Sequence, residues 1–286
     1  MSPVHFSLVQ HPWLFTLVFI LIFLVCTILV RLLLIMILKF PQNGSKTDFW
    51  APLIQHLLTL FVIVPFGLGF LKRSDPYTAY LDEIHLTPFR PLLGLILLGI
   101  SCYLILALCQ AVGVLVYRLR EGQPVDKNFI RSAFVLANEL PPRSSSWWTT
   151  FPSIFEEVAF RGVILAMFLR FYDQPKAILF SALGFGLMHI FNLLNRRELV
   201  WVGGQIVWAV ILGLFYGYVT LKTDSLLPAM IVHYLGNLFI SALNAYIQQN
   251  APIRIQALYG IIFTLGAIPS VLMSLWVYAF TSLLLS

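Results

Sequence analysis

The stretch WLFTLVFILIFLVCTILVRLLLIMIL, residues 13–38, decides what kind of fold this chain can adopt. It exceeds the roughly 20 mostly apolar residues that an α-helix needs to cross a bilayer. Its single charge, Arg31, lies toward one end, where a long basic side chain can reach the polar interface. The stretch therefore predicts a transmembrane helix.

The rest of the chain has the same apolar character. Of its 286 residues, 59% are hydrophobic and 10% are charged, whereas a soluble domain carries about 25% charged residues. A soluble core could not bury so much apolar surface, so the bilayer must solvate most of the chain. The net charge of +6 comes from basic residues scattered through short loops, which is usual in a membrane protein and does not indicate nucleic-acid binding.

Eight segments satisfy the length rule for a membrane span. We therefore predict an all-α fold, a polytopic transmembrane helical bundle with about eight spans. The predicted spans are 13–38, 51–71, 91–117, 148–170, 175–195, 200–221, 226–247 and 256–284.

Ionisable side chains inside these spans are the most informative residues, because each charge at the bilayer centre costs about 2.5–3.5 kcal/mol. The strongest cluster is FPSIFEEVAFRGVIL, residues 151–165. Glu157 and Arg161 are four residues apart with the acid first, which is the favourable order for an ion pair on one helix face. Glu156 lies about 100° around the helix from Glu157. It is therefore left without a local cation and suits a group that takes and returns a proton.

A structural role for Glu156 is the alternative. Ser153 and Glu156 fit the S-x-x-E capping box, with Pro152 directly before the serine. In that case the carboxylate would only satisfy amides at the N-terminus of its own helix. The sequence leaves both interpretations open.

A second cluster is SALGFGLMHIFN, residues 181–192. His189 lies deep in the fifth predicted span, with Phe185 one turn before it. Gly184 and Gly186 allow another helix to approach closely. A histidine in an apolar helix is more often a hydrogen-bonded core residue than a catalytic one, so this cluster alone does not decide its role.

The third cluster is SLLPAMIVHYLGNLFI, residues 225–240. His233 and Asn237 are four residues apart and share one face of an otherwise apolar span. Polar contacts between membrane helices are the structural alternative. The three clusters together supply a carboxylate, two imidazoles and an amide, which are the groups needed to activate water and stabilise an oxyanion. One shared site explains the three clusters better than three coincidences.

These motifs resemble a known family. EExxxR at 156–161, FxxxH at 185–189 and HxxxN at 233–237 are similar to the three motifs of the CPBP family, the CAAX proteases and bacteriocin-processing enzymes, also called the Abi family. The type II CAAX prenyl endopeptidases belong to it. The order of the motifs and the single helix between the second and third also match. The resemblance covers about residues 90–250.

The resemblance implies an eight-helix core with a membrane-embedded catalytic cavity. It divides the chain into N-terminal transmembrane helices at 1–90, a CPBP-like catalytic core at 91–250 and a C-terminal transmembrane helix at 251–286. It also implies that Glu157 and Arg161 form a supporting ion pair.

The resemblance further implies the roles of four catalytic residues. Glu156 would be the general base on water, assisted by His189. His233 and Asn237 would hold the oxyanion of the tetrahedral intermediate. The expected activity is that of an intramembrane glutamate endopeptidase.

We expect no cofactor, although zinc held by Glu156, His189 and His233 is the alternative. The sequence has no HExxH motif, in which one helix carries two ligands and the base. If Glu156 bound zinc, a separate base would be needed. Glu157 is the nearest candidate for that base, but it is expected to be held in an ion pair with Arg161. A metal-free mechanism is therefore favoured.

The expected substrate is a membrane-associated protein: a prenylated CAAX protein, a bacteriocin leader or a sorting-signal protein. The alternatives are a proton-coupled transporter, for which we would expect internal pseudo-symmetry, and a non-catalytic immunity or scaffold protein. Short loops and compact size predict a multi-pass protein of a prokaryotic inner (cell) membrane. Its partners would be lipid and peptide substrate, with no nucleic acid.

Overall fold

The part of the chain that can be described is helical and contains no β-strand. The all-α prediction is therefore confirmed. Most of the predicted last span, 256–284, lies outside the described residues. The computed structural model describes residues 8–41, 45–72, 74–87, 89, 91–120, 151–194, 199–250, 268, 271–272 and 274–276.

The first seven predicted spans coincide with helical segments. Two of these segments continue as π-helices (η2 and η4), and one ends as a 3-10 helix (η5). In chain order the elements are η1 (Leu8–Gln10), α1 (Pro12–Met36), α2 (Ser45–Leu58), η2 (Thr59–Gly67), α3 (Tyr77–Glu83), α4 (Leu92–Arg120), α7 (Pro152–Glu157), η4 (Val158–Ile164), α8 (Leu165–Leu169), α9 (Gln174–Met188), η5 (His189–Leu194), α10 (Leu199–Thr223) and α11 (Leu227–Asn250).

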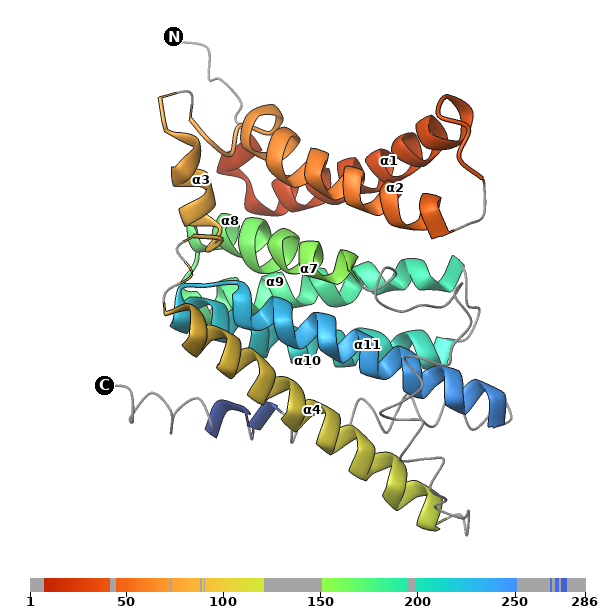
Figure 1. Cartoon of the computed structure of the whole chain (residues 1–286). Helices are drawn as coiled ribbons and strands as arrows, with labels where there is room; N and C mark the ends of the chain where they lie inside the picture. Colours follow the sequence, from red (N-terminus) through yellow and green to blue (C-terminus); the bar gives the residue numbers. More distant parts are fainter. Residues whose placement is uncertain are drawn as a thin grey trace.

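The helices form layers around α7, α8 and α9 (Figure 1). α1 and α2 pack on each other and lie on one side of this centre, while α4 lies on the opposite side and packs along α11. α9 and α10 pack together, and α11 contacts both α7 and α10. α7 is therefore reached by α2 from one side and by α11 from the other.

Five described helices are long and apolar enough to cross a membrane. On α1, the side chains of Leu17, Leu21 and Ile28 are more than half exposed, as expected for helix faces that contact lipid. The segment from α7 to α8 is not among the five, and it carries Glu157 and Arg161. The predicted count of eight spans is not established by these helices. The five are Pro12–Met36, Thr47–Gly67, Leu92–Cys109, Gln174–Leu193 and Val202–Thr223.

The largest hydrophobic core joins the N-terminal helices to the second half of the chain. Phe15 of α1 and Leu60 of η2 are fully buried in the same cluster as Val163 and Met167 of the central helices. Burying side chains of this size stabilises the fold by about 1.5–3 kcal/mol each. The core thus contains residues from both sides of position 90, the predicted boundary between the N-terminal helices and the catalytic core. The division of the chain into three parts stays a prediction.

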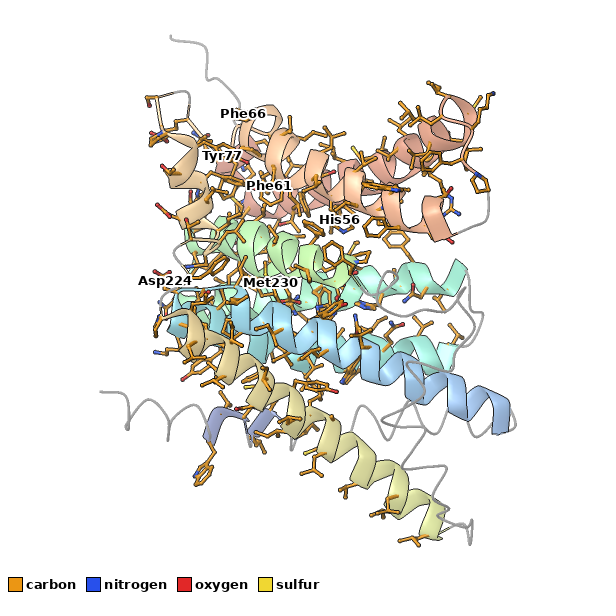
Figure 2. The ribbon with its side chains drawn as sticks, viewed as in Figure 1. His56, Phe61, Phe66, Tyr77, Asp224 and Met230 are labelled. Atoms are coloured by element: carbon orange, nitrogen blue, oxygen red, sulfur yellow. The ribbon has the colours of Figure 1, made fainter. Side chains whose placement is uncertain are left out.

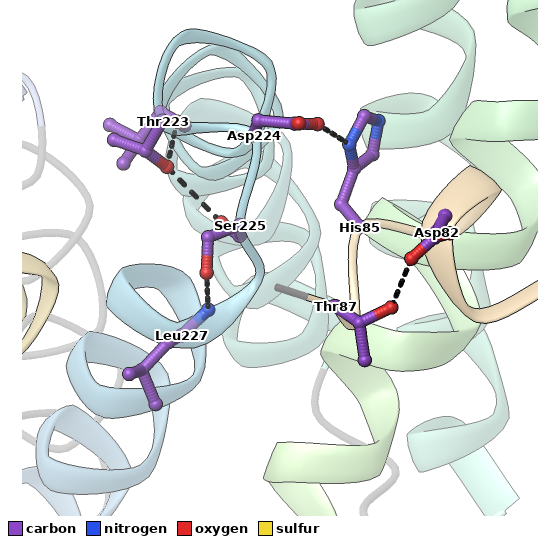
Figure 3. Close-up of polar contacts among 8 residues, drawn as sticks. Asp82, His85, Thr87, Thr223, Asp224, Ser225 and Leu227 are labelled. Atoms are coloured by element: carbon purple, nitrogen blue, oxygen red, sulfur yellow. Dashed lines mark hydrogen bonds and ion pairs between the residues drawn. The ribbon is translucent and has the colours of Figure 1, made fainter. Parts of the chain in front are cut away.

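A polar clamp holds the loop after α3 against the turn between α10 and α11 (Figure 3). His85 and Asp224 both have left-handed backbones, with φ of 56° and 49°, and His85 Nδ1 lies 2.6 Å from Asp224 Oδ1. The backbone N–H of Leu226 donates to the carbonyl of His85 at 2.9 Å, and Thr87 of the loop donates to Asp82 of α3. These bonds fix where α11 begins.

Glycines allow α9 to pack closely on α10, and Gly186 is the most tightly enclosed of them. A Cβ atom on Gly186 would lie 2.4 Å from Val210 Cγ2 and 3.0 Å from the carbonyl oxygen of Ile206. A Cβ atom on Gly184 would meet only Phe160, at an ordinary 3.9 Å. The predicted close approach therefore occurs at Gly186 and not at Gly184.

We expect Gly186→Ala to lower the free energy of unfolding by about 1–3 kcal/mol, because the added methyl group must push α10 away from α9. Gly203→Ala on α10 is the matched control, since nothing lies within 4 Å of the place that a Cβ atom would take there, and alanine is the better helix former. Thermal unfolding in detergent measures both. Equal midpoints for the two variants would contradict this account of the packing.

Candidate active site

The adjacent acids Glu156 and Glu157 lie at the end of α7, where the helix widens into the π-helix η4. Pro152 begins α7, at a position where its missing N–H needs no partner. A π turn redirects side chains and is frequent at functional sites. The side chain of Glu157 is fully buried, whereas that of Glu156 is 36% exposed. The two acids therefore have different surroundings.

Glu157 is bound from two directions. Its Oε1 atom lies 3.2 Å from Nη1 of Arg161, so the expected ion pair is present. The same oxygen accepts a hydrogen bond from Nδ1 of His233 at 2.5 Å. This second contact was not predicted. Glu157 does more than neutralise Arg161, because it also orients a histidine from α11.

Arg161 is fully buried and is held largely by aromatic rings. Its guanidinium carbon lies 4.1 Å from the ring centre of Phe185 and 5.4 Å from that of Tyr216. Within the described residues, no hydrogen bond of good geometry reaches its nitrogens, so cation–π contacts and the charge of Glu157 stabilise it. A Cβ atom on Gly213 would lie 3.0 Å from Nη2, and this glycine therefore makes room for the guanidinium.

Glu156 is not a helix cap. The N-cap of α7 is Phe151, which makes no side-chain capping bond, and Ser153 lies inside the first turn of the helix. The capping-box interpretation is therefore wrong, because the helix begins two residues earlier than that motif requires. Instead, Oε2 of Glu156 lies 3.7 Å from Nε2 of His233.

His189 is placed where α9 changes into the 3-10 helix η5. Its Nδ1 atom lies 3.0 Å from the carbonyl oxygen of Phe185. Since a carbonyl oxygen only accepts, Nδ1 carries the hydrogen and donates it. The Nε2 atom of neutral His189 is then a hydrogen-bond acceptor.

The predicted residues Glu156, His189, His233 and Asn237 all line one cavity of about 390 Å³. This volume falls in the range of small-molecule and peptide side-chain sites, about 300–1,000 Å³. The cavity walls are mostly apolar and aromatic. The remaining lining residues are Phe23, Leu24, Leu106, Phe160, Phe185, Met188, Phe191, Asn192, Gln205, Trp208, Ala209, Leu212, Tyr216 and Gly236.

Several lining residues were not predicted from the sequence. Tyr216 stacks on the ring of His233, with 5.9 Å between ring centres. Asn192 donates to Gln205 at 2.9 Å across the cavity wall. Tyr216, Asn192 and Gln205 are polar groups within or at the ends of apolar helices. The rule used for the glutamates, that polar groups inside spans are costly and therefore informative, could have identified them. Phe23 of α1 carries no such signal, because it is one apolar residue in an apolar helix.

The zinc alternative would use Glu156, His189 and His233 as ligands. The 3.7 Å between Glu156 and His233, and the bond from His233 to Glu157, are compatible with ligands backed by a second carboxylate. Among the described residues, however, no group of three or more His, Cys, Asp or Glu side chains is arranged to hold a metal ion.

Residues 145–239 match the family model described as "Type II CAAX prenyl endopeptidase Rce1-like". This segment is a domain of the CAAX protease (CPBP) family. The match contains all three motifs and therefore all four residues that line the polar end of the cavity. Among curated proteins, none matches the chain significantly.

The CAAX protease domain begins just before α7 and ends within α11. The long apolar helices and this domain make the chain a multi-pass membrane protein. α1, α2 and α4 lie outside the matched residues. Two of them, α1 and α4, nevertheless contribute Phe23, Leu24 and Leu106 to the cavity of the CAAX protease domain.

We expect Glu157→Gln to lower the free energy of unfolding by about 3–5 kcal/mol, because it leaves the buried charge of Arg161 without a counterion. Asp48→Asn is the matched control, since the Asp48–Arg31 pair is nearly half exposed and contributes about 1 kcal/mol or less. Thermal unfolding of the purified variants compares the two. A stability loss no greater than that of the control would show that Glu157 is dispensable for the fold.

Proposed function

We propose that this protein is an intramembrane endopeptidase that hydrolyses a peptide bond of a membrane-associated protein. The observation that supports this most strongly is the convergence of one carboxylate, two imidazoles and one amide on a single cavity. They come from three separate helical segments, α7, α9–η5 and α11. The mostly apolar walls suit a substrate that arrives from the bilayer.

Glu156 is the proposed general base. It is the one acidic side chain among the described residues that line the cavity. In this proposal its carboxylate removes a proton from water while Nε2 of His189 accepts a hydrogen bond from the same water. The resulting hydroxide attacks the carbonyl carbon of the substrate. Glu156 then passes the proton to the nitrogen of the leaving amine.

His233 and Asn237 are the proposed oxyanion donors. The Nδ1–H of His233 is already donated to Glu157, so the ring can donate to the oxyanion only through Nε2–H, as an imidazolium. Two carboxylates lie beside this ring, with Glu157 2.5 Å from Nδ1 and Glu156 3.7 Å from Nε2. The amide of Asn237 supplies a second donor. Donors fixed in a cavity away from water stabilise the tetrahedral intermediate more strongly than donors in water.

Prenylated CAAX proteins, leader peptides and sorting-signal proteins are the proposed substrate classes. Each would place its scissile bond near the membrane interface. The aromatic side chains of Phe23, Phe191 and Trp208 give the cavity a wall that suits an apolar group next to the cleaved bond. The compartment we propose is the inner membrane of a prokaryotic cell.

We expect Glu156→Gln to reduce cleavage at least ~100-fold without unfolding the protein, because the amide cannot accept the proton of water. Glu83→Gln is the matched control, since Glu83 is held by Arg170 in an exposed pair on α3. The assay uses full-length protein in lipid vesicles and a farnesylated CAAX peptide, a leader peptide and a sorting-signal peptide as probes, with products identified by mass spectrometry.

Cleavage of a probe by wild type and Glu83→Gln, but not by Glu156→Gln, supports the endopeptidase. Equal turnover by Glu156→Gln and wild type would sink the proposal that Glu156 is the base. If wild type cleaves none of the probes, and no membrane protein changes mass on its expression, a non-catalytic protein or a transporter takes the place of the enzyme.

We also propose that the reaction needs no metal. If Glu156 bound zinc, another base would be required, and Glu157 is engaged by both Arg161 and His233. We therefore expect enzyme treated with a chelator and freed of metal to keep at least half of its cleavage rate. Metal content is measured on the same sample by mass spectrometry. Complete loss of activity with rescue by zinc alone would overturn this part of the proposal.

A further inference from the structure

Two amide side chains on the cavity wall have no part in the proposed catalysis. Asn192 comes from η5 and Gln205 from α10, and both line the same cavity as Glu156 and His189. The cavity opens among the side chains that fill the space between the central helices and α11 in Figure 2. An amide placed in an apolar helix is unfavourable unless its polar atoms find partners. The presence of two amides at this cavity therefore needs a reason.

The two amides bond to each other and still leave polar groups available. Nδ2 of Asn192 donates to Oε1 of Gln205 at 2.9 Å, and among the described residues this is the one hydrogen bond that either side chain makes. A side-chain amide has two N–H donors and a carbonyl acceptor. The carbonyl oxygen of Asn192 and the –NH2 group of Gln205 therefore remain available. Turning both amides over would exchange their roles, and one acceptor and one donor would still remain.

Asn192 stands one turn beyond His189 on the same face of the 3-10 helix η5. In a 3-10 helix, side chains three residues apart eclipse each other, and the rise is about 2.0 Å per residue. Asn192 thus lies about 6 Å along the helix from His189, which is proposed to hold the attacking water. An extended peptide rises about 3.3 Å per residue, so this offset corresponds to about two substrate residues. Gln205 is on the stripe of α10 that also brings Trp208 and Leu212 to the cavity.

An acceptor beside a donor matches the main chain of an extended peptide. A strand residue that pairs with a neighbouring strand uses its N–H and its C=O on the same side. The amide pair presents the complementary groups, and neither amide carries a charge. Peptides that add to the edge of a sheet gain affinity from main-chain hydrogen bonds of this kind. An uncharged main-chain segment is therefore the ligand that the pair fits.

We propose that Asn192 and Gln205 form a subsite that binds the main chain of one substrate residue, about two residues from the cleaved bond. Asn192 accepts from the N–H of that residue, and Gln205 donates to its C=O. The bond between the two amides keeps both in place. Because these contacts are the same before and during the reaction, they lower KM without raising kcat. The inference rests on the proposed endopeptidase function.

The competing explanation is that the amide bond only holds η5 against α10, which pack together. Both explanations expect mutation of the pair to cause some loss of activity. They differ in what the loss depends on. A contact with the substrate is lost equally when the N–H is removed from the substrate, whereas a contact between two helices does not depend on the substrate at all.

Kinetics of two variants in the vesicle assay provide the first test, with the probe that wild type cleaves. Asn192→Leu and Gln205→Met keep the approximate size of each side chain and remove the amide. We expect each to raise KM about 10-fold with kcat within threefold of wild type. Gln55→Met on α2 is the matched control, since this buried glutamine bonds to Thr59 and does not line the cavity. It should change KM less than twofold.

Backbone esters in the probe provide the second test. An ester replaces one main-chain N–H by oxygen, and it is introduced at one residue at a time on either side of the cleaved bond, which stays an amide. For wild type, we expect one ester about two residues from that bond to raise KM about 10-fold and the others to change it less than threefold. With that one peptide, Asn192→Leu should add less than a twofold further rise, because the contact is already lost.

The outcomes separate the subsite from the endopeptidase. Suppose wild type cleaves the probe and Glu156→Gln does not, but Asn192→Leu causes the same loss with every ester peptide as with the all-amide peptide. The amides then only hold η5 on α10, so the subsite is overturned and the endopeptidase stands. The subsite is also overturned if no ester raises the KM of wild type more than threefold, a result that needs no variant to fold. If wild type cleaves no probe, both proposals fail together.

Discussion

The buried carboxylate of Glu157 is the constraint on which the arrangement of the site depends. It binds Arg161 of the following π-helix and His233 of α11 through one oxygen atom. A charge in this position is stable only with such partners. The guanidinium in turn needs the rings of Phe185 and Tyr216, which come from α9 and α10. One buried acid therefore requires four helical segments to meet at one place.

The same contacts leave Glu156 available. Its neighbour in the chain takes the buried cation, while the widened turn at the end of α7 leaves the Glu156 side chain partly exposed at the cavity. His233 connects the two acids, with Nδ1 on Glu157 and Nε2 3.7 Å from Glu156. A histidine held in this way has a fixed ring orientation. Such pre-organisation is what a site for oxyanion stabilisation requires.

The helices outside the CAAX protease domain also take part in the site. α1 supplies Phe23 and Leu24 to the cavity wall. Leu106 reaches the cavity from α4 on the opposite side. The largest core cluster joins the N-terminal helices to η4 and α8. The cavity is thus lined by residues of α1 and α4 as well as by the matched segment.

The sequence by itself determined the class of fold, because apolar runs of membrane-spanning length admit few structures other than helices. It also identified the four polar residues of the cavity and the Glu157–Arg161 pair, since charges inside spans are expensive and helical spacing sets which side chains share a face. The tertiary structure alone decided that Glu156 faces His233 instead of its own helix amides, and that Glu157 binds His233 as well as Arg161. It alone placed Tyr216 beside the site. These contacts join residues far apart in the chain, and helical periodicity within one segment carries no information about which helices become neighbours.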